Sequence, residues 1–178
     1  LYTENLAERV PEGVGGHPGS DAGGEIKRWP MDRFVEVALK LADEHQKEVR
    51  FFLGPSELAL EKAVPVHQRL KVIKPKSVKN LIQELHACTL FISNDSGLSH
   101  LAAGHGIPTA VIYGPTKIAE YILPTDYYPV EPEGFDCDTC FKNKKCDNAS
   151  ACLTSISVEK VIAAIEPQLT MTHEQQTS

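Results

Sequence analysis

The sequence predicts an α/β fold, a Rossmann-like three-layer structure in which helices cover both faces of a parallel sheet. Short apolar stretches at 49–53, 90–93 and 109–113 alternate with segments whose apolar residues recur at helical spacing. This alternation is typical of β-α-β units and therefore of a parallel sheet. Ligands bind such sheets outside the carboxyl ends of the strands, so the turns after the apolar stretches are the expected place for a site.

Each expected element has a local reason. Pro30 suits the first turn of a helix, because its fixed φ is already helical. Ser56, Ser77 and Ser157 precede segments of helical periodicity, and each hydroxyl can accept a hydrogen bond from the first turn. The segment 127–130 is ambiguous. In chain order, the expected elements are helix 30–42, strand 49–53, helix 57–63, strand 70–73, helix 78–85, strand 90–93, a short helix from 97, strand 109–113 and helix 158–165.

Length and composition indicate one soluble globular domain. The chain has 178 residues, of which 42% are hydrophobic and 24% charged, and this size buries enough surface for a core without disulfides. The formal net charge is −6 and no basic run occurs, so nucleic acid is not an expected partner. No apolar run approaches the roughly 18 residues that suggest a membrane span.

The turn after the stretch 90–93 is the most informative part of the chain. Gly97 allows a ligand to approach the backbone closely, and Ser96 offers a hydroxyl. The N–H groups and positive dipole end of the helix that begins here favour phosphate. Asp95 would repel a phosphate, so its carboxylate is expected to accept hydrogen bonds from sugar hydroxyls. Without a ligand, the same residues would serve as an ordinary helix cap.

Two blocks of motifs lie in a fixed order over about residues 17–166. The blocks contain His17-Pro-Gly-Ser20, Lys27-Arg-Trp-Pro30, Phe51-Phe-Leu-Gly-Pro-Ser-Glu57, Asp95-Ser-Gly-Leu-Ser-His100, Ala102-Ala103, Pro108 and Tyr113-Gly-Pro-Thr116. In this order and spacing they closely resemble glycosyltransferase family 9, the heptosyltransferases of lipopolysaccharide core synthesis. The resemblance implies the C-terminal, donor-binding half of a GT-B fold.

The resemblance assigns a role to each candidate residue. It implies that Ser20, Lys27, Ser96 and Gly97 bind the donor diphosphate, and that Asp95 binds the donor sugar. Glu57 would accept hydrogen bonds from the ribose hydroxyls; otherwise it is an acid that favours a first helical turn. His100 and Arg28 are assigned supporting roles, and Trp29 is expected in the core or as a platform. His17 and His105 are weaker candidates, and the segment 74–77 is expected to border the base.

The resemblance also implies the domain boundaries. Residues 1–16 are interpreted as a linker or remnant of a preceding segment, 17–166 as the nucleotide-sugar-binding domain and 167–178 as a disordered tail. Family members usually carry an apolar strand directly before the His-Pro-Gly-Ser loop, where this chain has Gly13-Val-Gly-Gly16. The first strand is therefore expected to be absent or supplied by sequence outside the chain.

The expected function is donor binding in an inverting glycosyltransferase that resembles ADP-heptose:lipopolysaccharide heptosyltransferase. The partners implied are a nucleotide-sugar donor such as ADP-heptose, a glycolipid acceptor and an N-terminal domain that carries the catalytic base. The expected location is the cytoplasm, or peripherally the cytoplasmic face of the inner membrane. A non-catalytic nucleotide-sugar-binding module and a transferase with another donor, for example UDP-linked, remain alternatives.

The cysteines allow more than one interpretation. Cys137, Cys140, Cys146 and Cys152 could hold a structural zinc, although the second pair lacks CxxC spacing. Disulfides and unmodified thiols are the alternatives, and the favoured expectation is that no metal or cofactor is needed. Cys88 is expected in the core.

Overall fold

The structure is a computed structural model that describes residues 13–20, 24–116, 126–135 and 151–170. Six parallel strands form one sheet in the order β3-β2-β1-β4-β5-β6, which confirms the predicted fold class. The strands are β1 (Gly13–His17), β2 (Glu48–Phe52), β3 (Leu70–Ile73), β4 (Cys88–Asn94), β5 (Thr109–Ile112) and β6 (Tyr127–Val130). The ambiguous segment is thus a strand.

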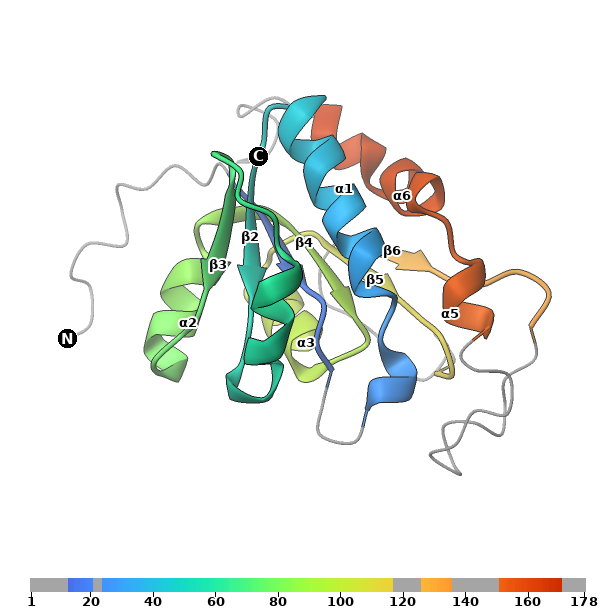
Figure 1. Ribbon diagram of the computed structural model, residues 1–178, viewed down its shortest axis with the longest axis horizontal. Coiled ribbons are helices and arrows are strands. Elements are labelled where there is room, and N and C mark those ends of the chain that lie inside the picture. Colours follow the sequence, from blue (N-terminus) through green and yellow to red (C-terminus); the bar gives the residue numbers. More distant parts are fainter. Residues whose placement is uncertain (1–12, 21–23, 117–125, 136–150, 171–178) are drawn as a thin grey trace.

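Helices cover both faces of the sheet (Figure 1). One face packs against α1 and α6, and its core includes Trp29, Phe34, Leu41 and Val161. The other face carries α2 and α3, with Phe91 at the centre of its core. The helical elements are η1 (Glu25–Lys27), α1 (Met31–Asp43), η2 (Pro55–Ala63), α2 (Val78–Leu85), α3 (Gly97–Gly104), α5 (Ala151–Ser155) and α6 (Val158–Thr170), where η denotes a 3-10 helix.

The glycine-rich segment before the His-Pro-Gly-Ser loop is the strand that was expected to be missing. β1 pairs with β2 on one side and β4 on the other, so it is central in the sheet. The assignment of residues 13–16 to a linker is therefore wrong. The strand needs few side chains of its own, because the Phe91 ring of β4 occupies the space beside Gly15.

The expected ends of several elements are partly correct. Ser77 and Ser157 accept hydrogen bonds from the Asn80 and Lys160 N–H groups, both at 3.1 Å, so both caps are confirmed. Ser56 is not a cap, because η2 begins at Pro55, after Gly54. The tail was expected from residue 167, but α6 continues through Pro167 to Thr170. Gln168 holds this last turn against the sheet, since its buried side-chain amide donates to the Tyr128 hydroxyl at 2.5 Å.

Gly15 and Gly16 should respond oppositely to alanine. A Cβ on Gly15 would lie 2.4 Å from Cδ2 of the fully buried Phe91 ring, whereas a Cβ on Gly16 meets nothing closer than the Arg50 carbonyl oxygen at 3.9 Å. Gly16 also lines a small cavity of about 10 Å³ beneath α1. We expect Gly15→Ala to lower the free energy of unfolding by about 1–3 kcal/mol.

The matched variant Gly16→Ala should raise that free energy by up to about 1 kcal/mol, because alanine restricts the unfolded chain and its methyl group fits. Urea denaturation followed by circular dichroism measures both. Equal effects of the two substitutions would contradict the role given to Phe91.

Candidate functional site

The order of the strands alone indicates where a ligand is expected to bind. The chain runs from β1 outward to β2 and β3, returns to β4 beside β1, and then proceeds to β5 and β6. The carboxyl ends of β1 and β4 therefore flank the point where the strand order reverses, which is where open α/β sheets bind ligands. The loop 18–20 follows β1 and the turn 95–97 follows β4, so both predicted motifs meet at this crevice.

Asn94 joins the two halves of this crevice. Its side chain is fully buried at the end of β4. Oδ1 accepts a hydrogen bond from the Trp29 N–H at 2.9 Å, while Nδ2 donates to the carbonyl oxygens of Pro18 at 2.9 Å and Gly19 at 3.0 Å. One amide thus fixes the loop after β1 and the segment before α1. Asn94 is not among the predicted site residues, although a polar side chain at the end of an apolar strand was the available signal.

Lys27 and Asp95, which are far apart in the sequence, form an ion pair. Lys27 Nζ lies 2.7 Å from Asp95 Oδ2, and their side chains are only 11% and 4% exposed. His100 Nε2 lies 3.8 Å from the other carboxylate oxygen. The structure therefore brings together three predicted residues at the N-terminus of α3, but it pairs the cation with the carboxylate.

The remaining predicted diphosphate contacts lie on both sides of the crevice. Ser96 is the N-cap residue of α3, and its buried Oγ lies 3.1 Å from Ser93 Oγ. Gly97 begins the helix. Ser20 donates to the Gly24 carbonyl at 2.8 Å and accepts from Arg28 Nε at 3.0 Å. Arg28 therefore holds the Ser20 side chain in place, and its role in ligand binding stays a prediction.

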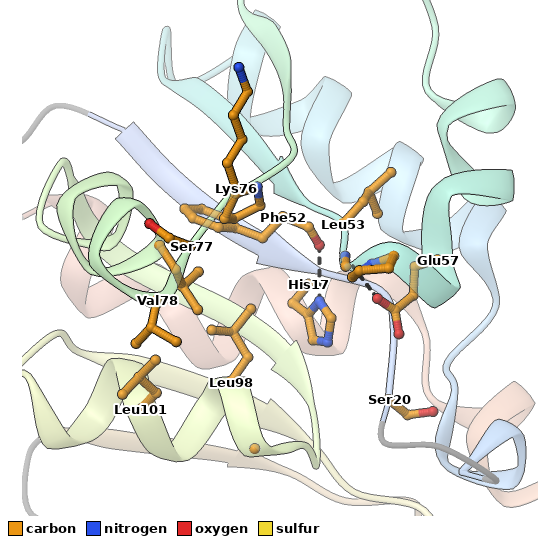
Figure 2. A pocket seen from close by; sticks show the side chains of 15 residues that line it. His17, Ser20, Phe52, Leu53, Glu57, Lys76, Ser77, Val78, Leu98 and Leu101 are labelled. Carbon is orange, nitrogen blue, oxygen red and sulfur yellow. Dashed lines mark hydrogen bonds between the residues drawn. The ribbon is translucent and has the colours of Figure 1, made fainter.

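A cavity of about 440 Å³ opens beside this polar group (Figure 2). Ser20, Glu57, Gly97 and His17 line it together with an apolar wall. The wall consists of Phe52, Leu53, Pro55, Pro75, Val78, Leu81, Leu98 and Leu101. Such a volume with few convergent polar groups is typical of a small-molecule site. Lys76 and Ser77 also line it, and the contact of the segment 74–77 with a base stays a prediction.

Glu57 is buried with both carboxylate oxygens engaged in its own turn. Oε2 accepts from the Gly54 N–H at 2.8 Å and Oε1 from Ser56 Oγ at 2.9 Å. Gly19 leaves room for this side chain, because a Cβ there would lie 2.6 Å from Glu57 Cγ and 2.7 Å from His17 Cε1. The close approach requires glycine at 19, and the carboxylate keeps capacity for further hydrogen bonds at its remaining lone pairs.

His17 lies at the cavity itself, although the sequence indicated only a weak candidate. Its ring is buried and lines the cavity, and Nδ1 donates to the Phe52 carbonyl at 2.9 Å, as Figure 2 shows. Because a carbonyl can only accept, Nδ1 carries a proton, and in the neutral ring Nε2 is then an acceptor. The signal available in the sequence was its position directly after a strand.

Two tyrosines interact near Asp95: Tyr113 directly follows β5, and Tyr127 is the first residue of β6. The Tyr127 hydroxyl donates to the Tyr113 hydroxyl, and Tyr113 is fully buried. Burial raises the pKa of Tyr127, and the Tyr113 hydroxyl and the Asp95 charge raise it further. The Tyr127 phenol therefore remains neutral near Asp95 at physiological pH.

The described part of the chain contains no group of three or more His, Cys, Asp or Glu side chains arranged to hold a metal. Of the four cysteines considered for zinc, Cys152 packs in the apolar core, while Cys137, Cys140 and Cys146 lie outside the described residues. Cys88 is a core residue as predicted, and burial raises the pKa of its thiol to about 12.

Comparison with known proteins relates this chain to one family of enzymes. The model of the family described as glycosyltransferase family 9 (heptosyltransferase) matches residues 14–146. The chain belongs to glycosyltransferase family 9. It is 31% identical over 163 residues to a lipooligosaccharide heptosyltransferase 2 of Campylobacter jejuni, covering 86% of this chain and 50% of that protein. It is also 30% identical over 113 residues to lipopolysaccharide heptosyltransferase 2 of Escherichia coli, covering 58% of this chain and 31% of that protein.

Solved structures of the family share the fold. A family 9 glycosyl transferase from Veillonella parvula superposes with a TM-score of 0.73 at 27% identity, over 89% of this chain and 46% of that one. The E. coli heptosyltransferase WaaC with ADP-2-deoxy-2-fluoro heptose gives a TM-score of 0.71 at 21% identity, over 92% of this chain and 45% of that one. The chain thus spans about half the length of the relatives that it matches. No helix within the described ranges is long and apolar enough to cross a membrane.

Replacing Asn94 by aspartate should disrupt the crevice. The new carboxylate oxygen would face the Pro18 and Gly19 carbonyl oxygens in place of an N–H donor, so a buried group is left unsatisfied at a cost of about 2–4 kcal/mol of unfolding free energy. Trp29 is the only tryptophan of the chain. Its backbone N–H donates to the Asn94 side chain, so its fluorescence should shift as well.

The matched variant is Asn80→Asp, the same change at the start of α2, where the side chain is partly exposed. It should change the unfolding free energy by less than about 0.5 kcal/mol and leave the Trp29 emission unchanged. Chemical denaturation and fluorescence spectra test both variants. If Asn94→Asp were equally mild, Asn94 would not hold the crevice together.

Proposed function

We propose that this chain is the donor-binding half of an inverting glycosyltransferase that uses a nucleotide-sugar. The observation that carries the proposal is the buried Lys27–Asp95 ion pair at the N-terminus of α3, beside a cavity at the reversal point of the sheet. A cation and helix N–H groups suit a diphosphate, while a carboxylate suits sugar hydroxyls. Membership of family 9 supports the same reading.

In this proposal each part of the site has one task. The base and ribose occupy the cavity, with the segment 74–77 along the base and Glu57 toward the ribose. The diphosphate lies at Ser96 and Gly97, where Lys27 and the Ser20 loop complete its environment. The sugar then extends toward Asp95. The apolar wall matches a flat heterocycle, and the polar residues follow one another along the remaining length of the ligand.

The proposed donor is ADP-heptose and the proposed acceptor is a lipooligosaccharide or lipopolysaccharide core. The curated relatives named above are heptosyltransferases, and the WaaC structure holds an ADP-linked heptose analogue. We place the reaction at the cytoplasmic face of the inner membrane. The catalytic base is assigned to the half of the family fold that this chain does not match, so the chain alone should bind the donor without transferring its sugar.

Lys27 and the N-terminus of α3 are proposed to stabilise the leaving diphosphate. An acceptor oxygen forms a bond to the anomeric carbon while the bond from that carbon to the β-phosphate oxygen breaks, and the electron pair departs with the phosphate. The acceptor proton passes to the base. Lys27 and the N–H groups of α3 are placed to stabilise the negative charge that develops on the diphosphate.

Calorimetric titration of this chain with nucleotides tests the proposal. We expect ADP to bind at least about tenfold more tightly than AMP, because a charge-assisted hydrogen bond to the β-phosphate contributes roughly 1.5–3 kcal/mol. Lys27→Met should remove most of this difference. The matched variant Lys40→Met, in the last turn of α1 at the opposite edge of the sheet, should leave it intact.

Equal affinities for ADP and AMP would refute the diphosphate assignment. Tighter binding of UDP or GDP than of ADP would retain the glycosyltransferase proposal and replace the donor. Binding of the donor by a full-length parent without any sugar transfer would favour a non-catalytic binding module.

A further inference from the structure

The ion pair leaves the cation of the site already neutralised before a ligand arrives. Lys27 and Asp95 are 2.7 Å apart and both are largely buried, so neither charge is well screened by water. Any diphosphate that Lys27 contacts must therefore lie close to the Asp95 carboxylate as well. The second cation nearby, Arg28, is directed elsewhere, because it donates to Ser20 and lies 3.8 Å from Glu25.

Donor and product differ in the charge of the diphosphate and in the presence of the transferred sugar, and both properties affect interactions with the Asp95 carboxylate. A sugar-linked diphosphate has no ionisable terminal oxygen, whereas the released nucleoside diphosphate gains a charge with a pKa near 6. The sugar that is transferred also carries hydroxyls that can donate hydrogen bonds to a carboxylate, and the product has lost this sugar. The Asp95 carboxylate should thus be satisfied by the donor and should repel the product.

We propose that the Lys27–Asp95 ion pair makes the site favour the sugar-bearing donor over the nucleoside diphosphate that the reaction releases. The inference rests on the proposed function and adds a specificity role for the pair. Lys27 attracts the diphosphate of both ligands, while Asp95 sets the difference between them. Product release is thereby favoured by the same residue that holds the sugar.

The size of the effect follows from elementary electrostatics. Two like charges about 6 Å apart at an effective dielectric constant of about 20 alter an affinity by roughly a hundredfold, and salt reduces this. Because Lys27 offsets part of the repulsion, about tenfold is the expected change in product affinity. Because both side chains are largely buried, a higher ionic strength should reduce this change only slightly.

Glu57 offers a matched control within the same site. It is also a buried carboxylate, but its partners are the neutral Gly54 N–H and Ser56 hydroxyl. Glu57→Gln and Asp95→Asn each remove one negative charge from the crevice. A general charge effect would act alike in both variants, whereas the proposed selection depends on Asp95 alone.

The experiment is calorimetric titration of wild type, Asp95→Asn and Glu57→Gln with ADP and with ADP-heptose at low and high salt. Asp95→Asn should bind ADP about tenfold more tightly and ADP-heptose several-fold less tightly. Glu57→Gln should weaken both ligands by a similar factor, because the ribose is common to them. Weaker ADP binding in Asp95→Asn, or an unchanged ratio of the two affinities, would overturn the proposal.

Asp95→Asn leaves the buried Lys27 charge without its carboxylate, so unfolding of each variant is measured first. If that variant does not fold, the double variant Lys27→Met/Asp95→Asn removes both charges and should bind ADP and ADP-heptose with nearly equal affinity. A retained preference for ADP-heptose in the double variant would overturn the inference. Failure of the proposed function would be recognised separately, because wild type would then bind neither ligand.

Discussion

The site depends on one buried amide at the end of the central strand β4. Asn94 uses three hydrogen bonds to hold the backbone of the β1 loop and the backbone of Trp29 at the same point. Both segments carry residues proposed to contact the diphosphate, Ser20 on one and Lys27 on the other. Since a buried amide is costly unless its partners are present, the loop positions and the side chain stabilise one another.

Close packing around this amide leaves little freedom for the neighbouring groups. A Cβ on Gly19 would collide with Glu57 and His17, and a Cβ on Gly15 would collide with Phe91. On the α1 side, the Trp29 indole N–H donates to the Ile156 carbonyl at 3.0 Å, which ties the same segment to the end of α5. The diphosphate region is thus held by the core of the sheet, and the ion pair is one consequence: η1 brings Lys27 to the turn where Asp95 follows Asn94.

Much of this arrangement could be predicted from local pattern. Apolar strands alternating with capped helices indicated the sheet, and the turn 95–97 indicated the crevice. β1 could not be predicted, because its stability comes from the two neighbouring strands and from Phe91 rather than from its own glycines. Asn94 and the pairing of Lys27 with Asp95 depend on contacts between segments 65 or more residues apart, which no local pattern records. Glu57 accepts a hydrogen bond within its own turn and also lines the cavity. Its proposed contact with the ribose therefore stays a prediction beside its structural role.

A crystal structure of this chain with bound ADP tests the proposed site most directly. In that structure the β-phosphate should lie within hydrogen-bond distance of Lys27 Nζ and the Gly97 N–H. The adenine should occupy the apolar part of the cavity, and the three Asn94 hydrogen bonds should persist. Binding of ADP away from the carboxyl ends of β1 and β4, or release of the Pro18–Gly19 loop from Asn94 in the complex, would contradict the proposed site.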